Sequence, residues 1–297
     1  MPTALHIIVS NHGSAVYHRG FMNYLSDFHT HTTFCDGRST PREMLFRAIE
    51  LGFVAYGFSG HGGCAVPGIT AMDGKTEEKY VAEILSLKEE FSDRIKIYLG
   101  IEAEYGEKRY FPKRICPCSP FDYVIGAVHL IETPAGLLPC DHSEGDIPPL
   151  LDGYFGGDFE SLAESYFARA AKIPEKIDAT FIAHIDLISK YKNVYNYTFG
   201  KRYYDAALGC VDALIPYGIP FEINVGAITR GLRTTPYPDT RILRHIRERG
   251  GEIMINGDCH SAEKLGKYFD LAEELAISCG FTRRLVITDS GLDAVSL

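Results

Sequence analysis

The chain has 297 residues, of which 45% are hydrophobic, and its formal net charge is −9. This composition supports a large core and excludes a disordered chain, while the acidic balance argues against a protein that neutralises nucleic-acid phosphates with basic residues. No apolar run reaches the roughly 18–20 residues of a membrane span. We therefore expect neither a membrane nor a nucleic acid as partner, and the sequence leaves the oligomeric state open. The start of the chain is a poor signal peptide, and a chain this large is not expected to need disulfides, so we expect a cytoplasmic protein.

Residues 1–22 show no strong strand or helix pattern, and we expect a loose N-terminal extension before a single domain over residues 23–297. Runs of apolar, β-branched and aromatic residues then predict seven strands, over Tyr24–His29, Val54–Ser59, Ile95–Ile101, Tyr123–Val128, Thr180–Ile185, Pro220–Val225 and Glu252–Asn256. Helices are predicted from the Ser39–Glu43 cap to Leu51 and over Glu77–Phe91, Phe159–Lys176, Arg202–Tyr217, Asp239–Arg249 and Ala262–Ser278.

Alternation of strands and helices indicates a parallel sheet, and without a nucleotide-binding glycine motif it favours an α/β barrel over an open sheet. The segment Glu132–Asp158 is rich in Pro, Gly and Asp and is predicted to be a long loop, of the kind that forms lids or binding sites. His142 in this loop could reach a substrate, or it could be an ordinary surface residue.

Histidines and carboxylates fall at or just after the ends of the predicted strands. These residues are His29, His31, Asp36, His61, Glu102, His129, His184, Asp258 and His260. The carboxyl ends of barrel strands form the active-site face, and residues two apart on a strand, such as His29 and His31, point to the same side. Scattered surface histidines would not align in this way, so the pattern predicts a metal site.

The ligand types indicate which metals would bind. Imidazole combined with carboxylate suits zinc, manganese or iron. Nine candidate ligands exceed the needs of one ion, so we expect two or three divalent ions that share a bridging carboxylate. Metals about 3.5–4 Å apart are typical of phosphoryl hydrolysis, which predicts an enzyme acting on a phosphate ester.

Seven short motifs occur in the order found in PHP-domain (polymerase and histidinol phosphatase) phosphoesterases: DFHTHTTFCDG, FSGHG, GIEAEY, YVIGAVH, IAHIDLI, EIN and NGDCH. This resemblance runs from about Asn23 to the C-terminus. Within the superfamily, PFDYVIGAVHLI, GYFGGDFESLAESYF and AHIDLISKY are most similar to the histidinol-phosphate phosphatases. The resemblance implies a distorted (β/α)7 TIM-like barrel that hydrolyses L-histidinol phosphate to L-histidinol and phosphate in histidine biosynthesis.

The resemblance also implies how the ligands are shared. One ion would be held by His29, His31, Glu102 and Asp258, a second by Glu102, His129 and His184, and a third by Asp36, His61 and His260. Some family members have a histidine at the position of Asp36, which bears on the metal preferred there. The nucleophile would be a metal-bridging hydroxide held by Glu102, with His29, His31, His129 and Asp258.

Three cations near the same strand ends are candidates for binding the substrate phosphate. Arg230 and Arg233 follow the sixth strand, and Lys190 follows the fifth. A guanidinium fork suits bidentate phosphate binding, although a solvated loop arginine is the alternative. Asn224 could support the site or form a buried polar pair, and Asp186 could orient a histidine or cap a turn.

Other functions compete with this interpretation. A different phosphoester, such as a nucleotide or a sugar phosphate, would use the same chemistry. A metal-dependent amidohydrolase also uses an HxH motif, but typically with eight strands and often a bridging modified lysine, so Glu102 favours the phosphoesterase. A proofreading module of a DNA polymerase is a further alternative, in a chain too short to hold the polymerase itself.

Overall fold

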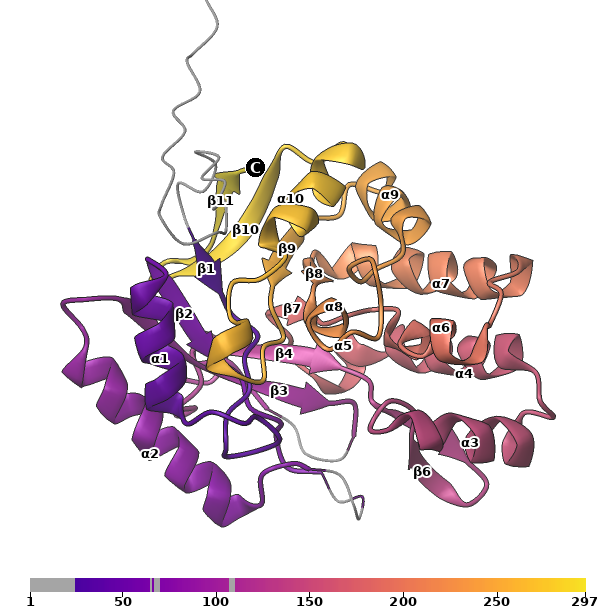
Figure 1. Ribbon diagram of the computed structural model, residues 1–297, viewed down its shortest axis with the longest axis horizontal. Helices are drawn as coiled ribbons and strands as arrows, with labels where there is room; N and C mark the ends of the chain where they lie inside the picture. The colour runs from indigo at the N-terminus through magenta and orange to yellow at the C-terminus, as the bar shows by residue number, and fades with distance from the viewer. Residues whose placement is uncertain (1–24, 65, 67–69, 107–109) are drawn as a thin grey trace, which may run out of the picture.

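The computed structural model describes residues 25–297, apart from residue 65 and residues 67–69 and 107–109. Seven parallel strands form a nearly closed barrel with helices around it (Figure 1), which confirms the predicted fold. In barrel order the strands are β1 (Ser26–Asp27), β2 (Ala55–Phe58), β3 (Lys96–Glu104), β4 (Tyr123–Ala127), β7 (Phe181–Ile182), β8 (Phe221–Asn224) and β9 (Ile253–Asn256). A bridge between Thr30 and Cys259 joins the first and last strands just beyond their ends. All seven predicted strands are thus confirmed.

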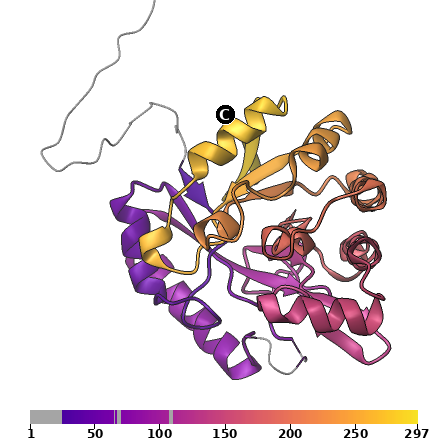
Figure 2. The same ribbon diagram turned by 45° about the vertical axis from the view of Figure 1, so that its right-hand side comes forward.

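The helices lie on the outside of this barrel (Figure 2). They are α1 (Pro41–Glu50), α2 (Gly74–Glu90), α3 (Ile147–Tyr154), α4 (Phe159–Ala170), α5 (Ile173–Lys176), α6 (Lys192–Tyr195), α7 (Lys201–Leu214), α8 (Gly226–Thr229), α9 (Thr240–Glu248) and α10 (Phe269–Ser278). Short 3-10 helices occur at η1 (Glu144–Asp146), η2 (Leu187–Ser189), η3 (Ile215–Tyr217) and η4 (Ala262–Lys264). The predicted cap of the first helix is confirmed, because Thr40 and Glu43 form a reciprocal capping box.

Two predicted helices are interrupted. The helix predicted over Phe159–Lys176 is divided into α4 and α5, and a proline in the first turn of α5 is compatible only with a new start. The helix predicted from Ala262 is also wrong in its first half. Gly266 and Tyr268 have positive φ angles of 76° and 65°, so the helical path breaks there and α10 begins at Phe269.

The segment Glu132–Asp158 is not the structureless loop that its composition predicts. It contains most of a hairpin, formed by β5 (Leu130–Thr133) and β6 (Gly136–Pro139), and the helix α3. Gly136 has a φ of 108°, which suits the hairpin turn, and a proline in the first turn of α3 starts that helix. The glycine and proline residues that predict a loop therefore mark the turn of a hairpin and the start of a helix.

The interior of the barrel below the site is filled by aromatic side chains. Tyr123 is fully buried, and its hydroxyl donates to the carbonyl oxygens of Phe28 at 2.8 Å and Phe58 at 3.1 Å. A Cβ atom at Gly57 on β2 or at Gly100 on β3 would lie 2.4 Å or 2.2 Å from this side chain, so the ring requires glycine at both positions. This packing joins β1, β2 and β4 and supports the residues that follow them.

A hairpin that the sequence analysis did not predict covers the amino ends of the barrel strands. It consists of β10 (Arg283–Thr288) and β11 (Gly291–Ser296). Val286 and Ile287 are buried in the same apolar cluster as Phe28 and Tyr98. The opposite end of the barrel is left for the candidate site.

The two predictions about domain boundaries both stay predictions. The predicted extension, residues 1–22, lies outside the described residues, and the single domain over residues 23–297 stays a prediction. None of the helices described combines the length and the apolar character that a membrane span requires.

Candidate metal centre

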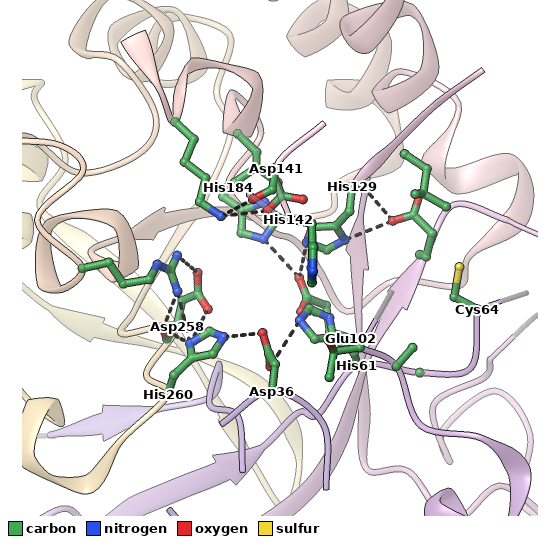
Figure 3. A pocket seen from close by; sticks show the side chains of 18 residues that line it. Asp36, His61, Cys64, Glu102, His129, Asp141, His142, His184, Asp258 and His260 are labelled. Carbon is green, nitrogen blue, oxygen red and sulfur yellow. Dashed lines mark hydrogen bonds and ion pairs between the residues drawn. The ribbon is translucent and has the colours of Figure 1, made fainter. Parts of the chain in front are cut away.

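All nine predicted metal ligands gather at the carboxyl end of the barrel. They lie at or beyond the ends of six of the seven strands: His29, His31 and Asp36 follow β1, His61 follows β2, Glu102 lies near the end of β3, His129 follows β4, His184 follows β7, and Asp258 and His260 follow β9. Figure 3 shows most of them facing one another around a common centre. This convergence depends on the barrel, because parallel strands bring their carboxyl ends to one rim.

Glu102 is the centre of the cluster, and its two oxygens face different histidines. Oε1 lies 3.1 Å from His184 Nε2 and 3.3 Å from His129 Nε2. Oε2 lies 3.3 Å from His29 Nε2, 3.4 Å from His31 Nε2 and 3.0 Å from His61 Nδ1. The carboxylate is almost completely buried. A side chain placed in this way is suited to bridge two cations.

Asp36 and Asp258 complete the cluster on its other sides. Asp36 lies 3.1 Å from His260 Nε2 and 3.6 Å from His61 Nε2. Asp258 Oδ1 lies 3.4 Å from His31 Nε2. The rings of His31 and His260 stack with centroids 4.3 Å apart, so the two carboxylates are linked through neighbouring imidazoles.

Two of these residues have an unusual backbone. His184 and Asp258 have φ angles of 20° and 47°, a region that non-glycine residues rarely adopt. Such conformations persist where the surrounding structure enforces them, and they concentrate at functional sites. Gly226 is required beside Asp258, because a Cβ there would lie 2.6 Å from Asp258 Oδ2.

The donor set fits divalent metal ions. His29 Nε2, His31 Nε2 and Glu102 Oε2 are buried and have no hydrogen-bond partner in the described structure. Leaving such atoms unpaired costs free energy that a bound cation would remove. Four groups of three or four ligand atoms lie close enough to hold an ion: His31, Asp36, His61 and His260; His29, His31 and Asp258; His29, Glu102 and His184; and His61, Glu102 and His129.

The charges at the site also favour a cation. Burial alone would raise the pKa of Glu102, but His29 and His61 hold it well below its usual range. Burial likewise opposes ionisation of Asp258, yet Arg230 and His29 hold the pKa of this carboxyl well below its usual range. Both carboxylates are therefore negative within a buried site, where an uncompensated charge is costly.

Two of the three predicted phosphate-binding cations line the pocket, and the third does not. Arg230 and Lys190 line the pocket above the cluster. Arg230 Nη2 lies 3.0 Å from Asp258 Oδ2, and Lys190 Nζ lies 3.0 Å from Asp141 Oδ2. Arg233 is not among the described residues that line this pocket, and its guanidinium lies 4.4 Å from the Tyr237 ring. A phosphate-binding role for Arg233 stays a prediction that its position does not favour.

Two acidic residues of the pocket were not identified from the sequence. Glu104 accepts hydrogen bonds from the backbone N–H of His129 and from its Nδ1, at 2.7 Å and 3.0 Å. The GIEAEY motif could have indicated Glu104. Glu102 and Glu104 are two residues apart on β3 and therefore point to the same side, as was expected for the two histidines of the HxH motif. Asp141 lines the pocket beside His142, and no spacing in that loop indicated it.

The contacts of Asp186 favour its alternative role in a turn. Its carboxylate accepts from the backbone N–H of Asp239 at 2.9 Å and contacts Ser189.

Two cysteines lie close to the site without joining the ligand groups. Cys35 Sγ is 3.5 Å from His31 Nδ1, and Cys64 lines the pocket.

Known proteins resemble this chain along most of its length. Residues 27–226 match the PHP domain family. A histidinol-phosphatase of Lactococcus lactis is 30% identical over 277 residues, which cover 86% of this chain and 91% of the relative. A Bacillus subtilis histidinol-phosphatase is 24% identical over 266 residues, which cover 82% of this chain and 96% of the relative. A crystal structure of a Lactococcus lactis histidinol phosphate phosphatase, complexed with zinc, L-histidinol and phosphate, is similar to this structure with a TM-score of 0.66. The two sequences are 21% identical, and the match covers 90% of this chain and 98% of that chain.

Proposed function

Because this chain belongs to the PHP domain family, we propose that it hydrolyses L-histidinol phosphate to L-histidinol and phosphate. The observation that carries this proposal is the position of Glu102, whose two oxygens face separate histidine groups beneath a pocket that Arg230 and Lys190 line. A bridged metal centre next to cations is suited to a phosphate ester. Under this proposal the protein acts in histidine biosynthesis, in the cytoplasm.

The pocket supports a small substrate. It encloses about 180 Å³, which is below the roughly 300–1,000 Å³ typical of sites for drug-sized ligands. A small monoester fits this size better than a polymer does. The barrel of seven strands and the carboxylate at position 102 also favour a phosphoesterase over an amidohydrolase.

We assign the ligands to three divalent ions, with zinc, manganese or iron as the candidates. The proposed sets are His29, His31, Glu102 and Asp258 for the first ion, Glu102, His129 and His184 for the second, and Asp36, His61 and His260 for the third. When bound, such ions neutralise charge on phosphate oxygens and lower the pKa of water. Each set is within or overlaps a group of ligand atoms that lie close together in the structure.

The protein's own residues would bind and orient the ester. Lys190 and Arg230 offer positive charge to the phosphate from the rim of the pocket, each at present paired with a carboxylate. In the reaction a water oxygen bonds to phosphorus, the bond from phosphorus to the alcohol oxygen breaks, and the alcohol leaves with a proton. His142 and Asp141 line the pocket and help to exclude solvent from the bound ester.

The direct test is phosphate release by zinc- or manganese-loaded protein over a panel of L-histidinol phosphate, nucleoside monophosphates and sugar phosphates. We expect kcat/KM to be highest for L-histidinol phosphate. A clear preference for another monoester would keep the chemistry and replace the substrate. No release from any monoester, with metal bound, would contradict the proposed reaction.

Replacing Lys190 by Met is expected to weaken substrate binding. A charge-assisted hydrogen bond contributes about 1.5–3 kcal/mol, so kcat/KM should fall roughly 10- to 150-fold. The effect should appear mainly in KM, measured by steady-state phosphate release. Lys201→Met is the matched control, because Lys201 is 86% exposed on α7 and should leave both constants unchanged. An unchanged KM in Lys190→Met would remove Lys190 from the substrate site.

A further inference from the structure

Glu222 on β8 is buried beneath the metal centre, where it touches residues from four strands or strand ends. Its Oε2 accepts from the backbone N–H of His184 at 3.0 Å and from Asn224 Nδ2 at 2.8 Å. Its Oε1 lies 3.0 Å from Asn256 Nδ2 and 2.8 Å from His29 Nδ1. The carboxylate is not a member of any ligand group, so its contact with the metals is indirect.

Backbone hydrogen bonds fix the orientation of both amide side chains. Asn224 Oδ1 accepts from the backbone N–H of Gly226 at 2.8 Å. Asn256 Oδ1 accepts from the backbone N–H of Phe28 at 2.9 Å. A backbone N–H can only donate, so each amide must turn its oxygen to the backbone and its NH2 group to Glu222. Glu222 therefore faces three donors whose roles cannot be exchanged.

The fourth contact follows from the other three. Because its other three partners can only donate, Glu222 is placed as an acceptor, and a carboxylate in its ionised form can only accept from its fourth partner as well. His29 therefore has to donate from Nδ1. In a neutral imidazole this leaves Nε2 as the free lone pair, and Nε2 is the atom that lies 3.3 Å from Glu102 and 3.9 Å from Asp258.

We propose that Glu222 is a positioning residue that fixes His29 with its proton on Nδ1, so that Nε2 is held ready to bind metal. This inference rests on the metal centre proposed above. Because the same carboxylate also holds the backbone of His184, it connects ligands on both sides of Glu102. Partners that orient ligating histidines usually change metal affinity or activity by 10–100-fold when removed.

The variant Glu222→Gln keeps the shape of the side chain and replaces one acceptor by a donor. If its NH2 group faces His29, the ring must accept at Nδ1, and its proton moves to Nε2. If the NH2 group faces His184 instead, it meets a backbone N–H that cannot accept. We expect zinc to bind about 10–100-fold more weakly, measured by competition with a chromogenic chelator, with the bound metal counted by elemental analysis.

Asp122→Asn is the matched control. Asp122 accepts from the backbone N–H of Leu99 at 2.8 Å and pairs with Lys88 at 2.7 Å, at the amino end of β4 and away from the metal centre. This substitution also replaces a carboxylate by an amide, so the variant protein should lose stability without losing zinc affinity. Equal zinc affinity in Glu222→Gln and Asp122→Asn, at similar melting temperatures, would overturn the proposal.

A second measurement reads the tautomer in the wild-type protein and so does not require Glu222→Gln to fold. In zinc-loaded wild-type protein labelled with 15N-histidine, NMR correlation of ring nitrogens and protons should show His29 protonated at Nδ1. The signal is assigned by its loss in His29→Gln. Glu222→Asp, which retains an acceptor, should keep this tautomer and regain part of the zinc affinity. An unprotonated Nδ1 in the wild type would overturn the proposal.

The outcomes also separate this inference from the metal centre on which it rests. Zinc uptake by the wild type, with unchanged affinity and tautomer in Glu222→Gln, would reject the role of Glu222 alone. No zinc uptake by the wild type would reject the metal centre itself, and the role of Glu222 with it.

Discussion

Replacing Glu102 by Gln is expected to remove metal binding and turnover together. The carboxylate contacts His29, His31, His61, His129 and His184 through its two oxygens, and it is almost completely buried. An amide of the same shape carries no charge and offers only one acceptor atom. Because loss of an outer partner alone costs about 10–100-fold, loss of this central ligand should lower kcat/KM by more than about 100-fold.

The measurement combines phosphate release with metal content by elemental analysis. Glu252→Gln is the matched control, since Glu252 pairs with Arg283 near the amino end of β9 and should leave turnover unchanged. His129→Ala removes one histidine but leaves both Glu102 oxygens in place, so it should bind more metal than Glu102→Gln. Turnover close to wild type in Glu102→Gln would contradict the bridging role.

The strands and the ligand cluster could be predicted because local sequence signals and barrel geometry agree. Each strand is a short buried run, which is the pattern of strands covered on both faces. Once seven such runs form a barrel, the histidines and carboxylates at the ends of six of them are brought to one rim. The pair His29 and His31 is the clearest case, because the two residues lie two positions apart just beyond β1 and both rings face Glu102.

Other parts of the site depend on long-range packing that sequence patterns do not contain. Lys190 and Arg233 were both candidates for phosphate binding because they follow strand ends, but of the two only Lys190 lines the described pocket. Arg233 is turned toward Ser189 and the Tyr237 ring, because these surround it after the chain folds back from β8. The contacts of Glu222 join residues up to 193 positions apart, so its role emerges only from the closed barrel.

Short elements with strong turn residues were the main errors in the predicted fold. The β5–β6 hairpin and α3 lie in a segment whose Pro and Gly content indicated a loop. Their residues matter for function, because Asp141, which follows β6, lines the pocket and pairs with Lys190. The expectation that this segment contributes to a binding site is thus supported by the structure, while its predicted lack of structure is wrong.

Removal of the metal ions is expected to abolish phosphate release and to lower thermal stability. The cluster places three carboxylates, of which Glu102 and Asp258 are buried, among six histidines, and several of its buried atoms have no hydrogen-bond partner in the described structure. Bound cations would offset the cost of burying these charges. Binding to the folded state alone stabilises it by about 2.7 kcal/mol at a free metal concentration 100 times Kd. Dialysis against a strong chelator should therefore lower Tm as well as turnover, and zinc or manganese should restore both.

The variant Glu102→Gln separates the two effects of metal. If the ions stabilise the fold through this cluster, added zinc should raise the Tm of the wild type and raise that of Glu102→Gln much less. A rise of equal size in both proteins would mean that zinc acts elsewhere on the chain. Full turnover in wild-type protein that elemental analysis shows to be free of metal would contradict a hydrolytic metal centre, because the described pocket would then hydrolyse the ester with its own side chains alone.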